Sequence, residues 1–225
     1  MEKALAAGAT VVAVAFAACL VERWLVRRRP EELAWAVALA LFACGSLSLW
    51  VGAALGWDDW SFRLFYTFGA VVNVPFLALG TIELLSPRAG RVCRVAIPLG
   101  CAFAAGVVLA APITGPIHAD VLPQGSDVFG VLPRVLAAVF SGLGALVVFG
   151  GAVWSAVRRQ RVVGNALIAL GTAVLSMSGV LNSALGEMDA FAVTLTVGVT
   201  VLFAGFLAAS SPLPRRRLRI AELAA

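Results

Sequence analysis

Between residues 21 and 30 the chain reads VERWLVRRRP, a basic interval that separates two long apolar segments. Arginines cluster again after the third, the fifth and the seventh apolar segment, whereas the other intervals are acidic or neutral. Because Lys and Arg stay on the cytoplasmic side of a membrane, this alternation predicts seven transmembrane helices, with the N-terminus outside and the C-terminus inside. The seven apolar segments cover roughly residues 4–22, 33–56, 62–85, 95–113, 129–153, 163–185 and 190–211.

The composition is that of a membrane protein. Of 225 residues, 61% are hydrophobic and 13% are charged, and the mean hydropathy is +0.98. Since one helix needs about 20 apolar residues to cross a bilayer, seven helices use most of the chain. We therefore expect a single all-α transmembrane domain over residues 1–225, with a cytoplasmic tail at 212–225 and no soluble catalytic or nucleic-acid-binding domain.

The net charge of +5 comes from an excess of arginine, since the chain has one lysine and sixteen arginines. Arginines beside a membrane orient helices and meet anionic lipid head groups. We therefore expect the lipid bilayer as a partner, and no nucleic acid. The preference for arginine indicates a GC-rich bacterial genome, which predicts a multi-pass protein of the bacterial inner membrane.

The chain aligns with itself when it is displaced by 130 residues. Between residues 22–59 and 152–189 there are 11 identities in 38 positions. They include the match of Trp24 with Trp154, which is informative because tryptophan is rare in this chain. The repeat predicts two parallel halves, at about 4–85 and 129–211, joined by a linker helix at about 95–113.

This three-plus-one-plus-three plan resembles, in topology only, that of sugar-efflux and PQ-loop transporters and of seven-helix opsins. The Pro-Gln motifs of those transporters are absent from the apolar segments. Lys3 is the only lysine, so the seventh helix cannot form the Schiff base with retinal that opsins use.

Three features in the first third of the chain are Arg28-Arg29-Pro30, the pair Trp35 and Trp50, and Arg63-Leu64-Phe65. In these features the chain resembles the seven-helix sensor modules that precede some bacterial histidine kinases. Stretches such as 63–70 and 77–81 also resemble uncharacterised seven-helix membrane proteins of GC-rich bacteria. The first resemblance implies a sensory role. Because no kinase domain follows Arg219, we expect signalling through another chain.

Residues that could catalyse a reaction or hold a cofactor are scarce. His118 is the only histidine, which excludes a haem held by two histidines and argues against a zinc site. The four cysteines match no metal motif, and no nucleophile has a base nearby in sequence. We therefore predict no catalytic residue, no metal and no cofactor, that is, a non-enzymatic protein.

Uncharged polar residues are the remaining candidates near the middle of the membrane, because Glu22 and Glu83 lie toward the arginine-rich ends, where they can pair with arginines. Asn73 lies about 16 Å into the third segment, and Pro75 leaves a carbonyl before it without its helical partner. These residues either line a small polar cavity or hydrogen-bond between packed helices. The candidates are Asn73, Ser46, Ser48, Ser176, Ser178, Asn182 and Thr200.

The predicted outer side has its own charged cluster. Asp59, Asp189 and Arg63 are candidates for an outer mouth, where carboxylates attract cations or pair with Arg63 and Arg134. The loop at 113–128, rich in proline and glycine, is expected to cap this mouth.

The function that these features favour is a ligand- or partner-binding membrane protein with a sensory or regulatory role and no output domain of its own. The ligand would be a small molecule or a lipid, and the partner a membrane or cytoplasmic protein. Gly52 and Gly56 form a pair of small residues that suits close helix packing, including a homodimer. The alternative is a small-solute transporter or facilitator that uses the interface between the repeats.

Overall fold

The computed structural model describes residues 2–157, 162–185 and 188–210, and most of these residues are helical. No strand occurs among them, although an isolated antiparallel bridge joins Ile113 and Phe129. The elements are α1 (Glu2–Arg27), α2 (Pro30–Leu55), α3 (Asp59–Tyr66), the π-helix η1 (Thr67–Val72), α4 (Asn73–Leu85), α5 (Pro87–Ala110), α6 (Gly125–Val128), α7 (Val131–Val157), α8 (Val162–Leu185) and α9 (Met188–Ser210).

Five helical segments are long and apolar enough to cross a membrane, which agrees with the predicted membrane protein. Within the described residues of α8 and α9, the apolar stretches are shorter, at Ala166–Leu175 and Val193–Ala208. The all-α class is confirmed for the described residues. The five spanning segments are Ala6–Arg27, Pro30–Leu55, Asp59–Leu85, Pro87–Ala110 and Val131–Ser155.

Helices α3 and α5 begin earlier than the apolar pattern predicts, because local capping extends them beyond the apolar residues. Helix α3 begins at Asp59, where Asp58 and Ser61 form a reciprocal capping box. Helix α5 begins at Pro87 rather than near residue 95. The Ser86 hydroxyl accepts from the backbone N–H of Ala89, and proline is favoured in the first turn of a helix.

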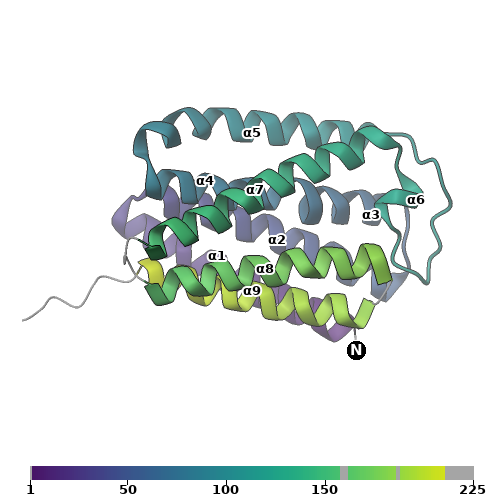
Figure 1. The fold of residues 1–225 in the computed structure, drawn as a ribbon. Coiled ribbons are helices and arrows are strands. Elements are labelled where there is room, and N and C mark those ends of the chain that lie inside the picture. Colours follow the sequence, from purple (N-terminus) through teal and green to yellow (C-terminus); the bar gives the residue numbers. More distant parts are fainter. Residues whose placement is uncertain (1, 158–161, 186–187, 211–225) are drawn as a thin grey trace, which may run out of the picture.

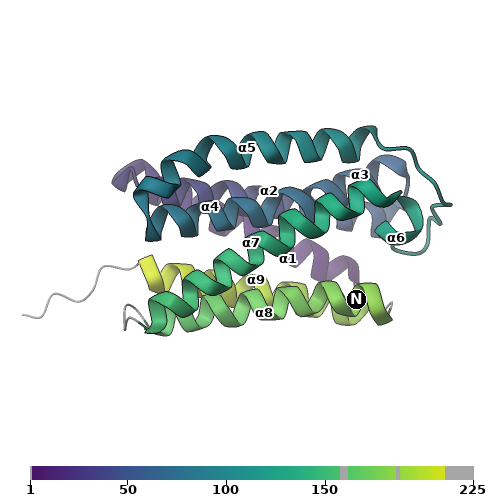
Figure 2. The same cartoon turned by 45° about the horizontal axis from the view of Figure 1, so that its top comes forward.

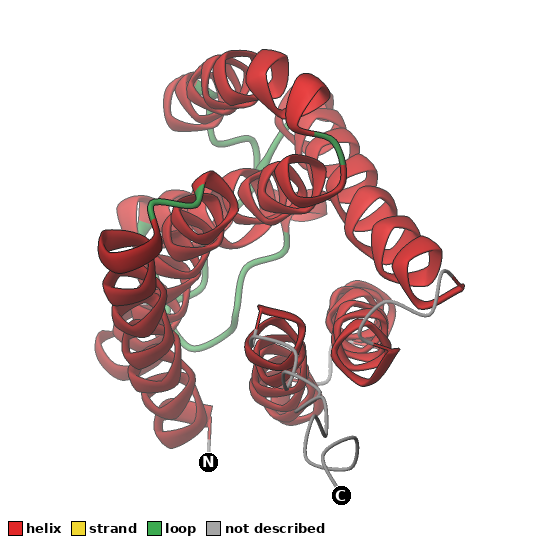
Figure 3. Cartoon of the chain, turned by 90° about the vertical axis from the view of Figure 1, so that its left-hand side faces the viewer, coloured by secondary structure: helices red, strands yellow, loops and turns green. Residues whose placement is uncertain are grey.

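The long helices lie side by side, parallel or antiparallel to one another. They form a closed bundle, and α5 lies outside it. Helix α2 packs against α1 and α4, α4 against α7, α7 against α8, α8 against α9, and α9 returns to α1. Helix α5 packs on α4 and α7 and lies on the opposite side from α8 and α9 (Figures 1 and 2). Figure 3 looks along the bundle, and the ring of helices is visible there.

The two ends of the bundle differ. Helix α6 and the start of α1 lie at one end, which we call the α6 end (Figure 1). The last turn of α1 and the start of α5, which carry arginines, lie at the other, which we call the arginine end. This separation matches the charge pattern of the sequence.

Aromatic stacking ties the first helices to the last one. The ring centroids of Phe16 in α1 and Phe203 in α9 are 3.6 Å apart, and those of Trp35 in α2 and Phe206 in α9 are 4.4 Å apart. The Trp35 indole also donates to the carbonyl of Leu77 at 3.3 Å. Aromatic pairs and close packing replace the hydrophobic effect where lipid surrounds the helices.

Carboxylates at the arginine end are buried against arginines. The expected pairing of Glu83 is confirmed, because its Oε1 accepts from Arg94 Nε at 2.7 Å. The sequence reasoning missed Glu32, which is only 1% exposed and lies 3.4 Å from Arg23 Nε and 3.6 Å from Arg27 Nη1. A carboxylate so buried needs opposite charge beside it, so these contacts fix α1 against α2.

Candidate ligand-binding cavity

A cavity of about 880 Å³ lies inside the bundle, between α2, the α3–η1–α4 path, α7, α8 and α9. Its volume falls in the range of roughly 300–1,000 Å³ that small-molecule sites occupy. The residues that line it are Phe42, Gly45, Ser46, Leu49, Phe62, Phe65, Tyr66, Gly69, Ala70, Val74, Leu77, Pro123, Gln124, Gly125, Ser126, Arg134, Ala137, Ala138, Ser141, Gly142, Ala145, Val148, Thr172, Leu175, Leu195 and Leu202.

The inner wall of the cavity consists mainly of apolar side chains. Its Ser46 and Thr172 hydroxyl groups already donate to helix carbonyls. The Ser46 hydroxyl donates to Phe42 O at 2.7 Å, and that of Thr172 donates to Ile168 O at 2.8 Å. Each is a bond within its own helix, four residues back. A ligand here would meet carbon atoms and hydroxyl oxygens whose protons are in use.

One wall of the cavity is an irregular helix. Residues Thr67–Val72 form a π-helix, whose hydrogen bonds join residues five apart. Pro75 is the residue five positions after Ala70, and it has no N–H to donate. The Ala70 carbonyl instead accepts from the Ser141 hydroxyl of α7 at 2.5 Å. The Ala70 carbonyl, in the turn before Pro75, thus joins η1 to α7.

The loop between α5 and α7 covers the α6 end of the cavity. The backbone N–H and the hydroxyl of Thr114 both donate to the Val128 carbonyl, at 2.9 and 3.1 Å. The loop also meets Tyr66, because a Cβ at Gly125 would lie 2.5 Å from its ring. Residues 123–126 of this loop line the cavity.

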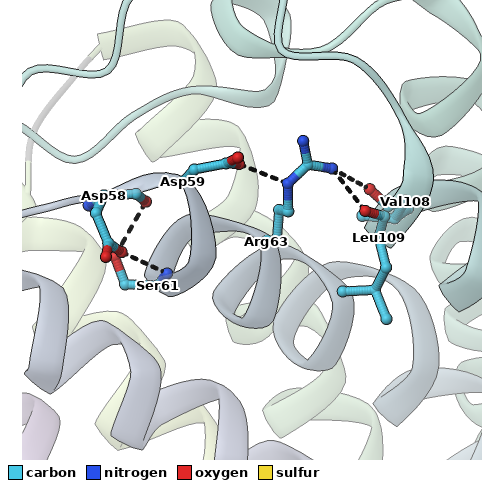
Figure 4. A network of polar contacts seen from close by, with 6 residues as sticks. All are labelled: Asp58, Asp59, Ser61, Arg63, Val108 and Leu109. Carbon is cyan, nitrogen blue, oxygen red and sulfur yellow. Dashed lines mark hydrogen bonds and ion pairs between the residues drawn. The ribbon is translucent and has the colours of Figure 1, made fainter.

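The predicted outer-mouth residues Asp59 and Arg63 do lie together, but outside the cavity lining. Arg63 is 7% exposed, its Nε donates to Asp59, and its Nη1 donates to the carbonyls of Val108 and Leu109, both at 2.9 Å (Figure 4). Those carbonyls belong to the last turn of α5, where helix carbonyls have no intrahelical donor. We interpret Arg63 as a clamp that caps α5 and holds it to α3.

Asp58, next to this clamp, caps α3. Its Oδ1 accepts from the backbone N–H of Ser61 at 2.7 Å, and the Ser61 hydroxyl returns a contact to the backbone of Asp58 (Figure 4). The hydrogen bonds from the Ser61 side chain and backbone hold the pKa of this carboxyl below its usual value of 3.8. Asp58 therefore stays ionised and stabilises the helix start down to acidic pH.

Of the midplane candidates whose side chains the structure describes, only Ser46 lines the cavity. Ser46 is buried and lines the cavity, whereas Ser48 is exposed and its hydroxyl donates to Cys44 O at 2.9 Å. Thr200 is also exposed and donates to Thr196 O at 2.7 Å.

Asn73 is buried, yet it does not line the cavity. Its Oδ1 accepts from the backbone N–H of Val74 at 2.7 Å, which is a local contact beside the break at Pro75. The side chains of Ser176, Ser178, Asn182 and Asp189 lie outside the described part of the chain.

Gly52 and Gly56 allow close packing and a turn at the end of α2. A Cβ at Gly52 would lie 2.6 Å from the Trp57 ring, so this glycine makes room for the buried indole. Gly56 ends α2 with φ of 97°, a conformation that side chains disfavour. Both positions thus serve the fold of α2 and its exit.

Sequence reasoning named Arg134 only as a partner for carboxylates on the outer side, not as a cavity residue, and it missed Tyr66. A signal for Arg134 did exist: with Arg63 it is one of the two arginines outside the four basic intervals. No comparable sequence pattern pointed to Tyr66, the only tyrosine. Its position at the cavity depends on how the loop between α5 and α7 folds over it.

Comparisons with protein-family models, with curated proteins and with solved structures found no match. The function is therefore inferred from the residues of the cavity themselves.

Proposed function

We propose that this chain is a seven-helix integral membrane protein that binds a small or lipid-like ligand in the cavity and has a sensory or regulatory role. The observation that carries the proposal is the cavity of about 880 Å³, which is apolar inside and polar at its α6 end. Pockets of this kind, with a few polar groups, are typical of small-molecule sites. Among the lining residues that the structure describes there is no His, Cys, Asp, Glu or Lys, so we propose binding rather than catalysis.

The proposed topology places the α6 end outside and the arginine end in the cytoplasm. It rests on the charge pattern of the sequence and on the position of the arginine-bearing turns of α1 and α5 at one end of the bundle. Helices α8 and α9 would supply the sixth and seventh spans. In the bacterial inner membrane the ligand would then enter from the outer leaflet or the periplasm.

The proposed internal repeat is supported by matching neighbours. In the first half α2 packs between α1 and α4, and in the second half α8 packs between α7 and α9. The halves meet where α4 packs on α7 and α9 packs on α1. The cavity is lined from α2, α4, α7, α8 and α9, so it would lie at the interface between the repeats.

A variant that fills the cavity tests the proposed ligand. A Cβ at Gly142, which lines the cavity, meets no atom within 4 Å, so Gly142→Leu adds volume there without a clash. The matched control is Gly150→Leu on the same helix, where a Cβ is equally free and no cavity is lined.

Native mass spectrometry of protein extracted gently from its own membranes gives the readout. We expect a small molecule or lipid at fixed stoichiometry with the wild type and Gly150→Leu, and its loss with Gly142→Leu. A bare wild-type chain, or equal retention by all three proteins, would contradict a ligand in this cavity. A protein that co-purifies in place of a ligand would support the partner-binding version of the proposal.

The alternative function is a small-solute transporter or facilitator, and the irregular wall at Thr67–Val72 favours it. Broken helices at the midplane are common where transporters bind substrate. In that case Asn73→Leu should reduce solute flux in proteoliposomes while the protein remains folded. A packing residue should instead lose stability or show no effect.

A further inference from the structure

The α6 end of the cavity carries one charged residue, Arg134, whose role the proposed function does not explain. Of the described residues that line the cavity, Arg134 is the one that carries a charge. No carboxylate of the described residues lies within ion-pair distance of it. Arg63, the other arginine outside the basic intervals, is already occupied by Asp59 and the end of α5.

The surroundings of Arg134 suit an anionic group. Arg134 lies in the first turn of α7, where the helix dipole adds positive potential, and Tyr66 lines the same cavity. Gln124 and Ser126 of the loop line the same end. The Ser126 hydroxyl already donates to Asp127 Oδ1 at 2.9 Å. The Arg134 guanidinium is therefore the group that would bind a carboxylate or a phosphate, as arginine commonly does.

The length of the cavity suits an acyl chain. Along α7 the lining runs from Arg134 to Val148, which is about 21 Å at a rise of 1.5 Å per residue. One leaflet of the hydrocarbon core is about 15 Å thick, half of about 30 Å. A chain whose head lies at Arg134 would therefore run from the head-group level past the midplane, along walls formed by residues such as Leu77, Leu175 and Leu202.

We propose that the ligand is a single-chain anionic amphiphile, whose head group binds Arg134 at the α6 end and whose hydrocarbon chain lies in the apolar part of the cavity. This inference rests on the proposed function, since it names the class of ligand for the same cavity. The head group is a carboxylate or a phosphate ester, so both fatty acids and lysophospholipids carry the required chemistry.

The test compares ligands of equal chain length that differ in charge. Hexadecanoate, hexadecan-1-ol and a hexadecanoyl lysophosphatidylglycerol are titrated against the full chain in zwitterionic nanodiscs, with empty nanodiscs subtracted. The variant is Arg134→Gln, which removes the charge but keeps most of the side chain. The control is Arg88→Gln, which removes one exposed arginine at the opposite end.

We expect the wild type and Arg88→Gln to bind at least one of the anionic amphiphiles about tenfold more tightly than the alcohol, as hydrogen bonds to a charged group imply. In Arg134→Gln that preference should disappear, with the affinity for the alcohol unchanged. Preference for hexadecanoate would identify a free fatty acid as the source, and preference for the lysophospholipid would identify a membrane lipid.

Two outcomes overturn the inference. In the first, the alcohol and both anions bind the wild type equally, or Arg134→Gln keeps the preference for an anion. Arg134 then does not recognise the head group, although a ligand still occupies the cavity and the proposed function stands. If none of the three binds and Gly142→Leu retains the same molecules as the wild type, the proposed function fails as well. Unchanged thermal unfolding of Arg134→Gln shows that folding is not the cause.

Discussion

Replacing Arg63 should destabilise the protein far more than replacing any other charged residue at the α6 end. Its guanidinium is 7% exposed and donates to Asp59 and to the carbonyls of Val108 and Leu109. In Arg63→Gln the two carbonyls at the end of α5 lose a charged donor, and the shorter side chain cannot reach both. The centre of the guanidinium also lies 5.7 Å from the Phe129 ring centroid, and that contact is lost too.

The magnitude follows from the bonds. Hydrogen bonds to a charged group contribute about 1.5–3 kcal/mol each, and Arg63 donates two of them to the carbonyls of Val108 and Leu109. We therefore expect Arg63→Gln to lower the free energy of unfolding by about 3–5 kcal/mol. Asp59→Asn should cost only about 0–1 kcal/mol, because the Asp59 side chain is 51% exposed and water solvates it.

The assay is equilibrium unfolding in mixed micelles with increasing sodium dodecyl sulfate, followed by helical circular dichroism. Arg134→Gln is the matched control, since it removes the same charge at the same end from an exposed side chain, and it should change stability by no more than about 0.5 kcal/mol. Equal effects of Arg63→Gln and Arg134→Gln would refute the clamp. An Arg63→Lys variant that keeps full stability would refute the need for a forked donor.

Two further predictions concern packing and topology. Gly80→Ala should destabilise the protein by about 1–3 kcal/mol, because a Cβ there would lie 2.3 Å from Trp35 Nε1, whereas Gly106→Ala, with nothing within 4 Å, should be neutral or stabilising; thermal unfolding decides between them. In a chain whose four cysteines are replaced by Ala, Ser126→Cys should react with a membrane-impermeant maleimide added to intact cells, whereas Ser86→Cys should react only after the cells are opened, and the reverse pattern would invert the proposed orientation.

The positions of the long helices were predictable because their length and hydrophobicity follow from the thickness of a membrane. Their ends were less so. Helix α5 continues outside the apolar stretch, through Arg88, Arg91 and Arg94, to the cap at Ser86. Hydropathy cannot find such an end, since arginines are good helix formers but poor membrane residues.

The cavity was predictable only in part. Ser46 and Ser48 were grouped by depth, yet residues two apart point to different sides of a helix, and only Ser46 faces inward. Helical geometry alone could have separated this pair. Glu32 could not have been placed in this way, because its burial depends on where the last turns of α1 bring Arg23 and Arg27.

The π-helix at Thr67–Val72 also sets how far α4, which continues from it, is rotated about its axis relative to α3. One residue corresponds to about 100° of turn in a regular helix, and a π-turn amounts to one inserted residue. If the same residues formed a regular α-helix without a deletion, α4 would rotate by about 100° against α2 and carry Gly80 away from the Trp35 ring that it accommodates. A regular third helix could therefore line the cavity or pack against α2 correctly, but it could not do both.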